Sequence, residues 1–289
     1  MTFDNILDTI IKNYKNGLLF SSIVLLSVLL FLGNQQITTG FIVPQGIDFT
    51  GGTQAMVEIT GTINIDALKQ NLETATDSRI IIKQLKDTNT ITIESKIPIT
   101  KELLKTAISE SGAEYKSSSI HTLGASLGAA FFTEALKAIL IAYIFMSIIV
   151  FFLFRSFVPS FAIIFASFAD ITTAIVGMNL LGLNLSMATI AGLLILIGYS
   201  IDTDILLSTR VLKRRSEGTV DERIKSSMKT GLTMSITSII AMIVLYLIST
   251  SIILDEIALV IIMGLTADIF YTWFQNVGIL KLYAEKKKL

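Results

Sequence analysis

Residues 187–208 read MATIAGLLILIGYSIDTDILLS, an apolar stretch that contains two aspartates, Asp202 and Asp204. The stretch is long enough for a membrane-spanning helix, which needs about 20 residues to cross roughly 30 Å of hydrocarbon. Asp170 and Asp268 lie in two further apolar stretches. A carboxylate in hydrocarbon is costly unless it is paired, hydrated or protonated, so such residues usually serve proton relays, ion pathways or contacts between helices. The four aspartates are therefore the first candidates for function.

The composition of the whole chain indicates a protein that crosses a membrane several times. Of its 289 residues, 52% are hydrophobic and only 16% are charged, and the mean hydropathy is +0.70. These values lie outside the range of soluble domains. The chain has no cysteine and a single histidine, His121, which excludes a disulfide framework, a thiolate metal site and a multi-histidine metal cluster. We expect neither a metal nor a cofactor.

Six long apolar segments predict six transmembrane helices. They cover residues 15–33, 134–154, 159–180, 187–208, 230–250 and 257–280. The first segment is the shortest and could also be a signal peptide. No clear small-x-small cleavage site follows it, so we interpret it as a membrane anchor that ends an N-terminal unit at 1–33.

Lysine and arginine residues lie on one side of these segments. They precede the first segment, follow the second, occupy the loop at 209–229 and recur in the tail at 281–289, whereas the loops at 181–186 and 251–256 contain none. Loops rich in lysine and arginine stay in the cytoplasm. We therefore predict a multi-pass plasma-membrane protein with both termini in the cytoplasm, and a tail that lies near anionic lipid.

The polar segment at 34–130 predicts a small α+β domain outside the cytoplasm, ahead of the remaining helices at 131–280. Strands are expected at 54–59, 79–85, 90–95 and 114–118, a turn at 86–89, and helices at 65–76 and 98–112. The order β-α-β-β-α-β is that of a ferredoxin-like domain. Its acidic and basic residues nearly balance, so no nucleic-acid or phosphate surface is expected. A structural cap and a substrate-handling domain are both compatible with this sequence.

The motif GIDFTGG at residues 46–52 lies just before the first expected strand. Gly51 and Gly52 permit positive φ or close backbone approach, and Asp48 can accept hydrogen bonds from backbone amides in a turn. A nucleotide-binding loop would need a following Lys-Ser/Thr pair and a helix. We predict a turn that starts at Gly46, and the lack of a Walker loop in the sequence excludes an ATP-driven pump.

Taken together, these motifs resemble the SecD/SecF family, the accessory subunits of the protein translocase. The resemblance rests on GIDFTGG at 46–52, IGYSIDTD at 197–204, Arg155 with Pro159-Ser160, Asp170, TAD at 266–268 and WFQN at 273–276. It extends over essentially the whole chain and is nearest to the archaeal SecF branch.

The resemblance implies one half of a bundle of the resistance-nodulation-division type, with six further helices supplied by a SecD-like subunit. It also implies an accessory role in moving or releasing polypeptides outside the membrane, which bacterial relatives couple to the proton gradient. The expected partners are a SecD-like subunit, a SecY-type channel, the translocating polypeptide and membrane lipid, with no nucleic acid. In the bacterial motif the proton-linked aspartate aligns with Thr203, and the bacterial Ser-Arg-Thr appears as Met228-Lys229-Thr230.

Helix geometry predicts that Asp202 and Asp204 face different sides of their helix. Residues two apart on a helix point about 200° away from each other, so Asp202 and Asp204 cannot both face one small site. We favour Asp204 for a site within this chain, because Ser200 and Ser208 share its face, and leave Asp202 for a partner subunit. Arg210 and Lys229 are the nearest cations by depth and are expected to pair with carboxylates in one state and release them in another.

The predicted coupling site for protons or other cations comprises Asp170, Asp202, Asp204, Asp268, Arg210 and Lys229. The alternative is that these aspartates only form structural hydrogen bonds between helices. A cation-coupled exporter of small molecules is a second candidate function, although such proteins normally carry larger external domains and both six-helix halves on one chain. An intramembrane aspartyl protease would need Gly-x-Gly-Asp at an active aspartate, which neither Asp202 nor Asp268 has, so we expect no enzyme.

Overall fold

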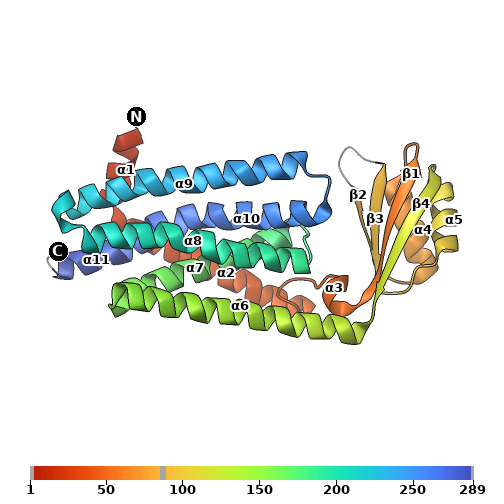
Figure 1. Ribbon diagram of the computed structural model, residues 1–289, viewed down its shortest axis with the longest axis horizontal. Coiled ribbons are helices and arrows are strands. Elements are labelled where there is room, and N and C mark those ends of the chain that lie inside the picture. The colour runs from red at the N-terminus through yellow and green to blue at the C-terminus, as the bar shows by residue number, and fades with distance from the viewer. Residues whose placement is uncertain (1–2, 85–88, 288–289) are drawn as a thin grey trace.

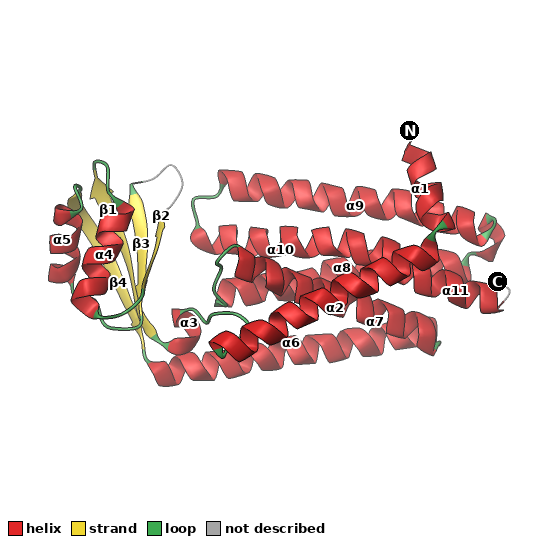
Figure 2. Ribbon diagram, turned by 180° about the vertical axis from the view of Figure 1, so that it is seen from behind, coloured by secondary structure: helices red, strands yellow, loops and turns green. Residues whose placement is uncertain are grey.

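Apolar segments form long helices in this protein, because a membrane leaves each backbone amide and carbonyl to be paired within its own segment. The structure is a computed structural model that describes residues 3–84 and 89–287. Five helices in it are long and apolar enough to cross a membrane: α2 (Tyr14–Thr39), α6 (Ala125–Phe154), α7 (Phe157–Leu180), α8 (Met187–Lys213) and α9 (Val220–Ile248). They form a bundle with a small α+β domain at one end and both termini at the other (Figures 1 and 2).

The sixth expected segment is divided into three elements. Helix α10 covers Ile252–Phe270, a π-helix, η2, covers Tyr271–Asn276, and α11 covers Val277–Lys287. Helix α10 is mostly apolar but contains three acidic residues, Asp255, Glu256 and Asp268, within its 19 residues. It packs against α7, α8 and α9 and completes the six-helix arrangement.

A short helix that hydropathy did not predict lies at the end of the bundle where the termini lie. Helix α1 covers Phe3–Lys12, and its Leu7 and Ile11 are buried one turn apart. These side chains pack in a cluster with residues of α8, α9 and η2, including Trp273. A single turn of 3-10 helix, η1 (Arg215–Glu217), follows α8.

The α+β domain has the predicted order of elements. Its elements are β1 (Gly52–Thr60), α4 (Ile65–Thr76), β2 (Ile80–Gln84), β3 (Thr90–Ser95), α5 (Lys101–Glu110) and β4 (Glu114–Leu123). The strands form one antiparallel sheet in the order β2-β3-β1-β4, which confirms the predicted α+β domain. The last strand is longer than the expected 114–118. Residues 86–88 of the expected turn, and Lys288 of the expected basic tail, lie outside the described residues.

The two faces of this sheet have different neighbours. Alternate residues of β1, Ala55, Val57 and Ile59, are buried in a core with residues of α4 and α5. Both helices lie on the side of the sheet that faces away from the bundle (Figure 1). The other face, which carries Lys83 and Glu94, is therefore turned toward the ends of α8 and α10.

The GIDFTGG motif forms the joint between the domain and the bundle. Residues Ile47–Thr50 make one helical turn, α3, followed by Gly51 with φ +74° and Gly52 with φ +146°. A Cβ atom on Gly51 would lie 2.6 Å from the backbone of Ala125, the first residue of α6. Glycine is therefore required at position 51 both for the positive φ and for the close approach of α6.

The sequence suggested that Asp48 would accept hydrogen bonds from the amides of its own turn. In the structure it does not. Its Oδ2 accepts a hydrogen bond from the backbone N–H of Met187 at 2.9 Å. The amides after Asp48 already donate to the carbonyls of Gly46 and Ile47, so the carboxylate is free to bind the first turn of α8. The Gly46 amide in turn donates to the Leu185 carbonyl at 2.8 Å, which joins the motif to the loop before α8.

The joint can be tested with two glycines that share a positive φ. Gly40 has φ +79°, and a Cβ atom there would meet nothing within 4 Å. We expect Gly40→Ala to lower the free energy of unfolding by about 1–2 kcal/mol, the cost of left-handed backbone. Gly51→Ala should cost clearly more, because its Cβ atom also meets the α6 backbone. Thermal unfolding of the purified variants measures both, and equal losses would show that the contact with α6 is unimportant.

Candidate functional site

Three aspartates from three helices lie together inside the bundle. Asp170 of α7, Asp204 of α8 and Asp268 of α10 are each 0% exposed. The hydroxyl of Thr272, in η2, lies 2.9 Å from Asp204 Oδ1 and 3.0 Å from Asp268 Oδ1. Ser200 of α8 donates a hydrogen bond to Asp170 Oδ2 at 2.5 Å. We call Asp170, Asp204 and Asp268 the aspartate cluster.

Asp268 is surrounded by hydroxyl groups from three elements. Its oxygens accept hydrogen bonds from Thr203 of α8 at 2.9 and 3.1 Å, from Ser235 of α9 at 3.3 Å and from Thr272 of η2 at 3.0 Å. Thr203 also lies 2.9 Å from the Ser200 carbonyl, within the same turn of α8 that binds Asp170. Asp268 therefore lies at the centre of the polar contacts between these helices.

Asp204 is held mainly by the π-helix. Besides the Thr272 hydroxyl, the side-chain amide of Asn276 donates to Asp204 Oδ1 at 2.6 Å. The second oxygens of Asp204 and Asp170 are buried and have no hydrogen-bond partner among the described residues. Buried carboxyl oxygens in that condition are unusual, because an unpaired buried polar atom is destabilising.

The donors of this cluster are neutral groups. Within residues 3–84 and 89–287, no lysine or arginine forms an ion pair with the three aspartates. A hydroxyl can donate to a carboxylate and can also accept from a carboxylic acid, whereas lysine and arginine only donate. The Thr272 hydroxyl has one hydrogen and two carboxyl neighbours, so a proton on either aspartate completes the set of hydrogen bonds. The arrangement can thus hold a proton between Asp204 and Asp268.

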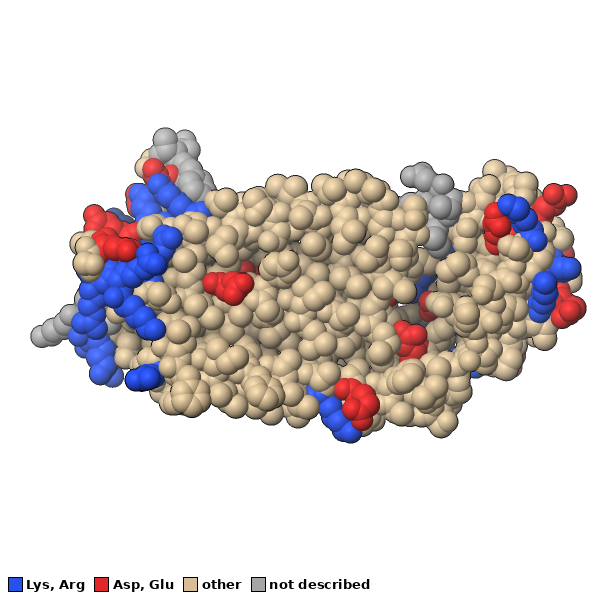
Figure 3. All heavy atoms as spheres, viewed as in Figure 1, with Lys and Arg blue, Asp and Glu red and all other residues tan. Residues whose placement is uncertain are grey.

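Asp202 lies outside the cluster. It is on the exposed side of α8, as its angular separation from Asp204 requires. It lines a shallow cavity together with Tyr199 of α8 and Met234 and Ser238 of α9. Figure 3 shows an acidic patch surrounded by uncharged surface on this part of the bundle.

The two predicted cations also lie apart from the cluster. Arg210 donates a hydrogen bond from Nη1 to the Ser226 hydroxyl at 2.6 Å, and Lys229 Nζ lies 2.6 Å from Asp4 Oδ1. The expected pairing of these cations with buried aspartates is not present in the described structure. For Lys229 the reason is α1, which carries Asp4 to the N-terminal part of α9 and provides an exposed partner there.

Four polar residues of the site were not predicted as hydrogen-bond partners of the aspartates: Thr203, Ser235, Thr272 and Asn276. A signal for two of them was present. Thr272 and Asn276 follow Asp268 at intervals of four residues in a largely apolar segment, and residues four apart on a helix are neighbours. Ser235 has no comparable signal, because it lies on a different helix.

Two threonines of one membrane segment test the hydrogen bonds of the cluster. Replacing Thr272 with valine keeps the shape but removes the hydroxyl between two buried carboxyls, so we expect a loss of about 1–3 kcal/mol in stability. Thr266 is exposed and bonds only its own helix, at Ile262 O, so Thr266→Val should change stability by less than about 0.5 kcal/mol. Denaturant titration of the purified variants provides the measurement. Equal effects would mean that the Thr272 hydroxyl does not contribute.

Comparison with known proteins places the whole chain in one family. The family model described as protein export membrane protein SecD/SecF, C-terminal, matches residues 103–286. The protein-export membrane protein SecF of Methanocaldococcus jannaschii is 41% identical over 283 residues, which is 94% of this chain and 96% of that protein. SecF of Haloferax volcanii is 38% identical and matches 90% of this chain and 89% of its own.

Solved structures show the same fold. The crystal structure of SecDF from Thermus thermophilus, described as a translocon-associated membrane protein, matches 95% of this chain with a TM-score of 0.74 and 23% identity. This chain spans 38% of that longer protein. A second SecDF structure, in a super-membrane-facing form, has a TM-score of 0.59.

These matches confirm the resemblance, the membrane fold and the prediction that the chain is a transport subunit and not an enzyme. The chain belongs to the SecD/SecF family of protein export membrane proteins, and within that family to the SecF proteins.

Proposed function

We propose that this chain works with a SecD-like subunit, at a SecY-type channel, to promote the translocation or release of polypeptides, and that the aspartate cluster couples this work to a gradient of protons or other cations. The observation that carries the proposal is the chemistry of the cluster. Three buried carboxyls, Asp170, Asp204 and Asp268, are held by hydroxyl and amide groups, with no lysine or arginine beside them in the described part of the chain.

A change of protonation at this site would act on the contacts between helices. When Asp268 is charged, it accepts hydrogen bonds from α8, α9 and η2 at once. When it is protonated, one of these hydroxyls must turn and accept a hydrogen bond instead. The preferred arrangement of the helices then differs between the two states, which is the requirement for coupling a gradient to movement.

The orientation that we propose places the α+β domain outside the cell. Both termini lie at the opposite end of the bundle (Figure 1), and most lysine and arginine side chains of the bundle gather there (Figure 3). The positive-inside rule assigns that end to the cytoplasm. Asp202, exposed in the middle of an apolar surface, would then face the SecD-like subunit, since a carboxylate is not expected to face lipid.

Two contacts connect the helices of the cluster to the α+β domain. Asp48 binds the start of α8, the helix that carries Asp204. Lys83 of β2 lies 2.7 Å from Glu256 of α10, the helix that carries Asp268, and 3.2 Å from Glu94 of β3. The second oxygen of Glu256 accepts a hydrogen bond from Ser186, the N-cap of α8, at 2.7 Å. Movements of α8 and α10 would therefore reach the domain that we place on the export side.

The cluster is tested by replacing single carboxyls with amides of the same shape. We expect Asp204→Asn and Asp268→Asn to reduce gradient-dependent polypeptide export by about tenfold or more, as for the loss of an essential proton-transfer group. Asp202→Asn, on the same helix but outside the cluster, should keep the gradient dependence. The measurement is export into membrane vesicles with and without an imposed gradient.

Co-purification of a SecD-like subunit with each variant controls for folding and assembly. If both cluster variants assemble and export with the full gradient effect, the aspartates serve only as structural hydrogen-bond acceptors. A wild-type chain that transported small molecules without a SecD-like subunit would contradict the export function itself.

The contact at Lys83 is tested against an exposed ion pair of the same domain. Removing Lys83 leaves Glu94 and Glu256 buried without their cation, so Lys83→Met should weaken docking of the domain by about 3 kcal/mol. Lys116 pairs with Glu58 where both side chains are largely exposed, and Lys116→Met should cost less than about 1 kcal/mol. The chain has no native cysteine, so spin labels at Lys69→Cys and Leu181→Cys report the distance between domain and bundle. A broadened distance distribution in Lys83→Met alone is the expected result.

The contact of Lys83 with Glu94 and Glu256 also has a predicted pH dependence. Burial alone would lower the pKa of Lys83, but the carboxylates of Glu94 and Glu256 outweigh burial and raise its pKa above the ordinary value of 10.5. Because the pKa of Lys83 is higher in the folded state, the stabilisation that Lys83 gives to the contact is complete below the ordinary pKa of lysine. This stabilisation is lost only as the pH rises through the raised pKa of the folded state. The distance distribution of the wild type should thus stay narrow up to about pH 10. Broadening near neutral pH would contradict a charged Lys83 in this contact.

A further inference from the structure

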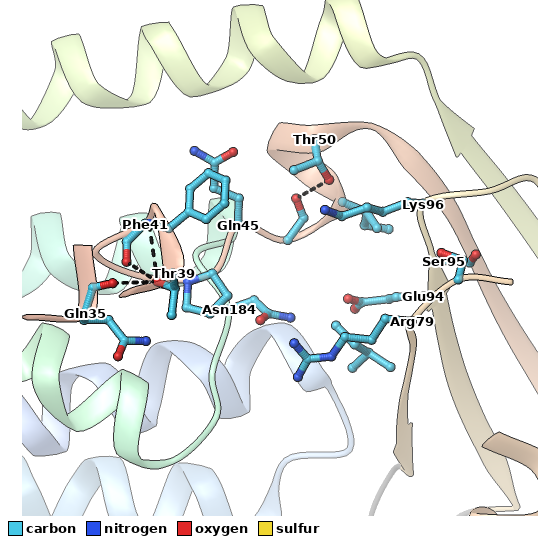
Figure 4. A pocket seen from close by; sticks show the side chains of 15 residues that line it. Gln35, Thr39, Phe41, Gln45, Thr50, Arg79, Glu94, Ser95, Lys96 and Asn184 are labelled. Carbon is cyan, nitrogen blue, oxygen red and sulfur yellow. Dashed lines mark hydrogen bonds between the residues drawn. The ribbon is translucent and has the colours of Figure 1, made fainter. Parts of the chain in front are cut away.

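Two cavities adjoin where the end of α2 approaches the α+β domain. The first has a volume of about 430 Å³ and lies between Gln35 and Thr39 of α2 on one side and Arg79 and Lys96 of the domain on the other (Figure 4). The second has a volume of about 380 Å³ and an apolar lining. The linker after α2 contributes Phe41 to both cavities. The two spaces are therefore neighbours, and the first, which we call the polar cavity, has more polar lining than the second, the apolar cavity.

The apolar cavity lies deeper in the bundle than the polar one. Its lining includes Phe132 and Leu136 of α6 and Ile190 and Leu193 of α8. Because α8 begins at Met187 and rises about 1.5 Å per residue, these two α8 side chains are roughly 5 and 9 Å below the helix end. Both cavities reach the last turns of α2, the first at Gln35 and Thr39 and the second at Gln36, but of these two only the second extends down to Leu193. This is the depth order of the head groups and hydrocarbon of a bilayer.

Two cations of the polar cavity have no partner within the described chain. Arg79 and Lys96 are exposed and form no hydrogen bond or ion pair with other described residues. Figure 4 shows both side chains extending from the domain into the cavity. Glu94 also lines the cavity, but its Oε1 accepts a hydrogen bond from Lys83 at 3.2 Å. The local charge therefore favours an anion, although the overall charge balance of the domain did not predict an anionic ligand.

We propose that the two cavities together bind one membrane lipid with an anionic phosphate head group. The phosphate lies between Arg79 and Lys96, where a guanidinium can donate two parallel hydrogen bonds and an ammonium adds a point charge. A hydrocarbon chain of the lipid occupies the apolar cavity along Leu136 and Leu193. The bound lipid would fill the space beside Gly46 and Ile47, at the joint between domain and bundle. The site is independent of the proposed coupling through the aspartate cluster.

Lipid binding is measured on the full purified chain in detergent, with tail-labelled phosphatidylglycerol and phosphatidylcholine as probes. We expect the wild type to prefer phosphatidylglycerol. The double variant Arg79→Gln/Lys96→Gln should lose about twentyfold in affinity for it, since each basic residue near a membrane surface contributes roughly fivefold. The matched control is Lys69→Gln/Lys101→Gln, which removes two exposed cations from α4 and α5 on the far side of the sheet. Its affinity should equal that of the wild type.

Competition separates a lipid site from a site for free phosphate. Glycerol 3-phosphate, which has the charge but no chains, should not displace phosphatidylglycerol at concentrations at which the unlabelled lipid does. Equal loss of affinity in the two double variants would overturn the assignment of Arg79 and Lys96. If the wild type bound phosphatidylglycerol and phosphatidylcholine equally, the lipid would be unspecific lipid around the protein and the proposed site would be wrong. Efficient displacement by glycerol 3-phosphate would assign the cavity to a soluble anion. All four substitutions are at exposed positions, and thermal unfolding verifies that both variants are folded.

Discussion

A carboxyl group inside a membrane bundle needs hydrogen-bond donors, and this requirement determines how the helices of the protein meet. Asp268 of α10 receives hydroxyl donors from α8, α9 and η2, while Asp204 depends on η2. Moving η2 would leave Asp204 without its donors, and moving α8 or α9 would remove a donor from Asp268. The choice of threonine, serine and asparagine as donors also matters. Arginine or lysine would favour the charged form of an aspartate, whereas a hydroxyl adapts to both forms.

The π-helix follows from the same requirement. In an α-helix each residue turns by about 100°, so positions four and eight residues after Asp268 drift by about 40° and 80° away from its face. A π-turn is wider than an α-turn and counteracts this drift. In the structure the π-helix begins directly after α10 and contains both Thr272 and Asn276. Both side chains consequently reach Asp204 from the segment that also carries Asp268.

The fold was predictable where a pattern repeats along the chain. Alternating residues around Val57 and the helical spacing at 65–76 predicted the α+β domain, and apolar length predicted the membrane helices. The orientation of Asp204 and Asp202 followed from the angle between neighbouring positions on a helix. Contacts between distant segments were not predictable in this way. The position of Lys229 in its membrane segment predicted a depth close to that of the aspartates. That depth does not show that Asp4 of α1 pairs with Lys229. The bond from Met187 to Asp48 joins residues 139 positions apart and has no local signal.

Thr203 illustrates how the site differs from the pattern of bacterial relatives. The resemblance aligns this position with an aspartate, but here its hydroxyl lies 2.9 Å from Asp268 Oδ1. The buried carboxyl of α8 is instead one residue further, at Asp204, and a shift of one residue turns a side chain by about 100° around the helix. Such a shift would separate the two carboxyls if nothing else changed. Thr272 lies between Asp204 and Asp268 within hydrogen-bond distance of both, so the structure connects two carboxyls on α8 and α10 through one hydroxyl. A proton exchanged through that hydroxyl would pass from the protonated carboxyl to the Thr272 oxygen while the hydroxyl hydrogen passes to the other carboxylate, and rotation of the hydroxyl would then restore its starting orientation.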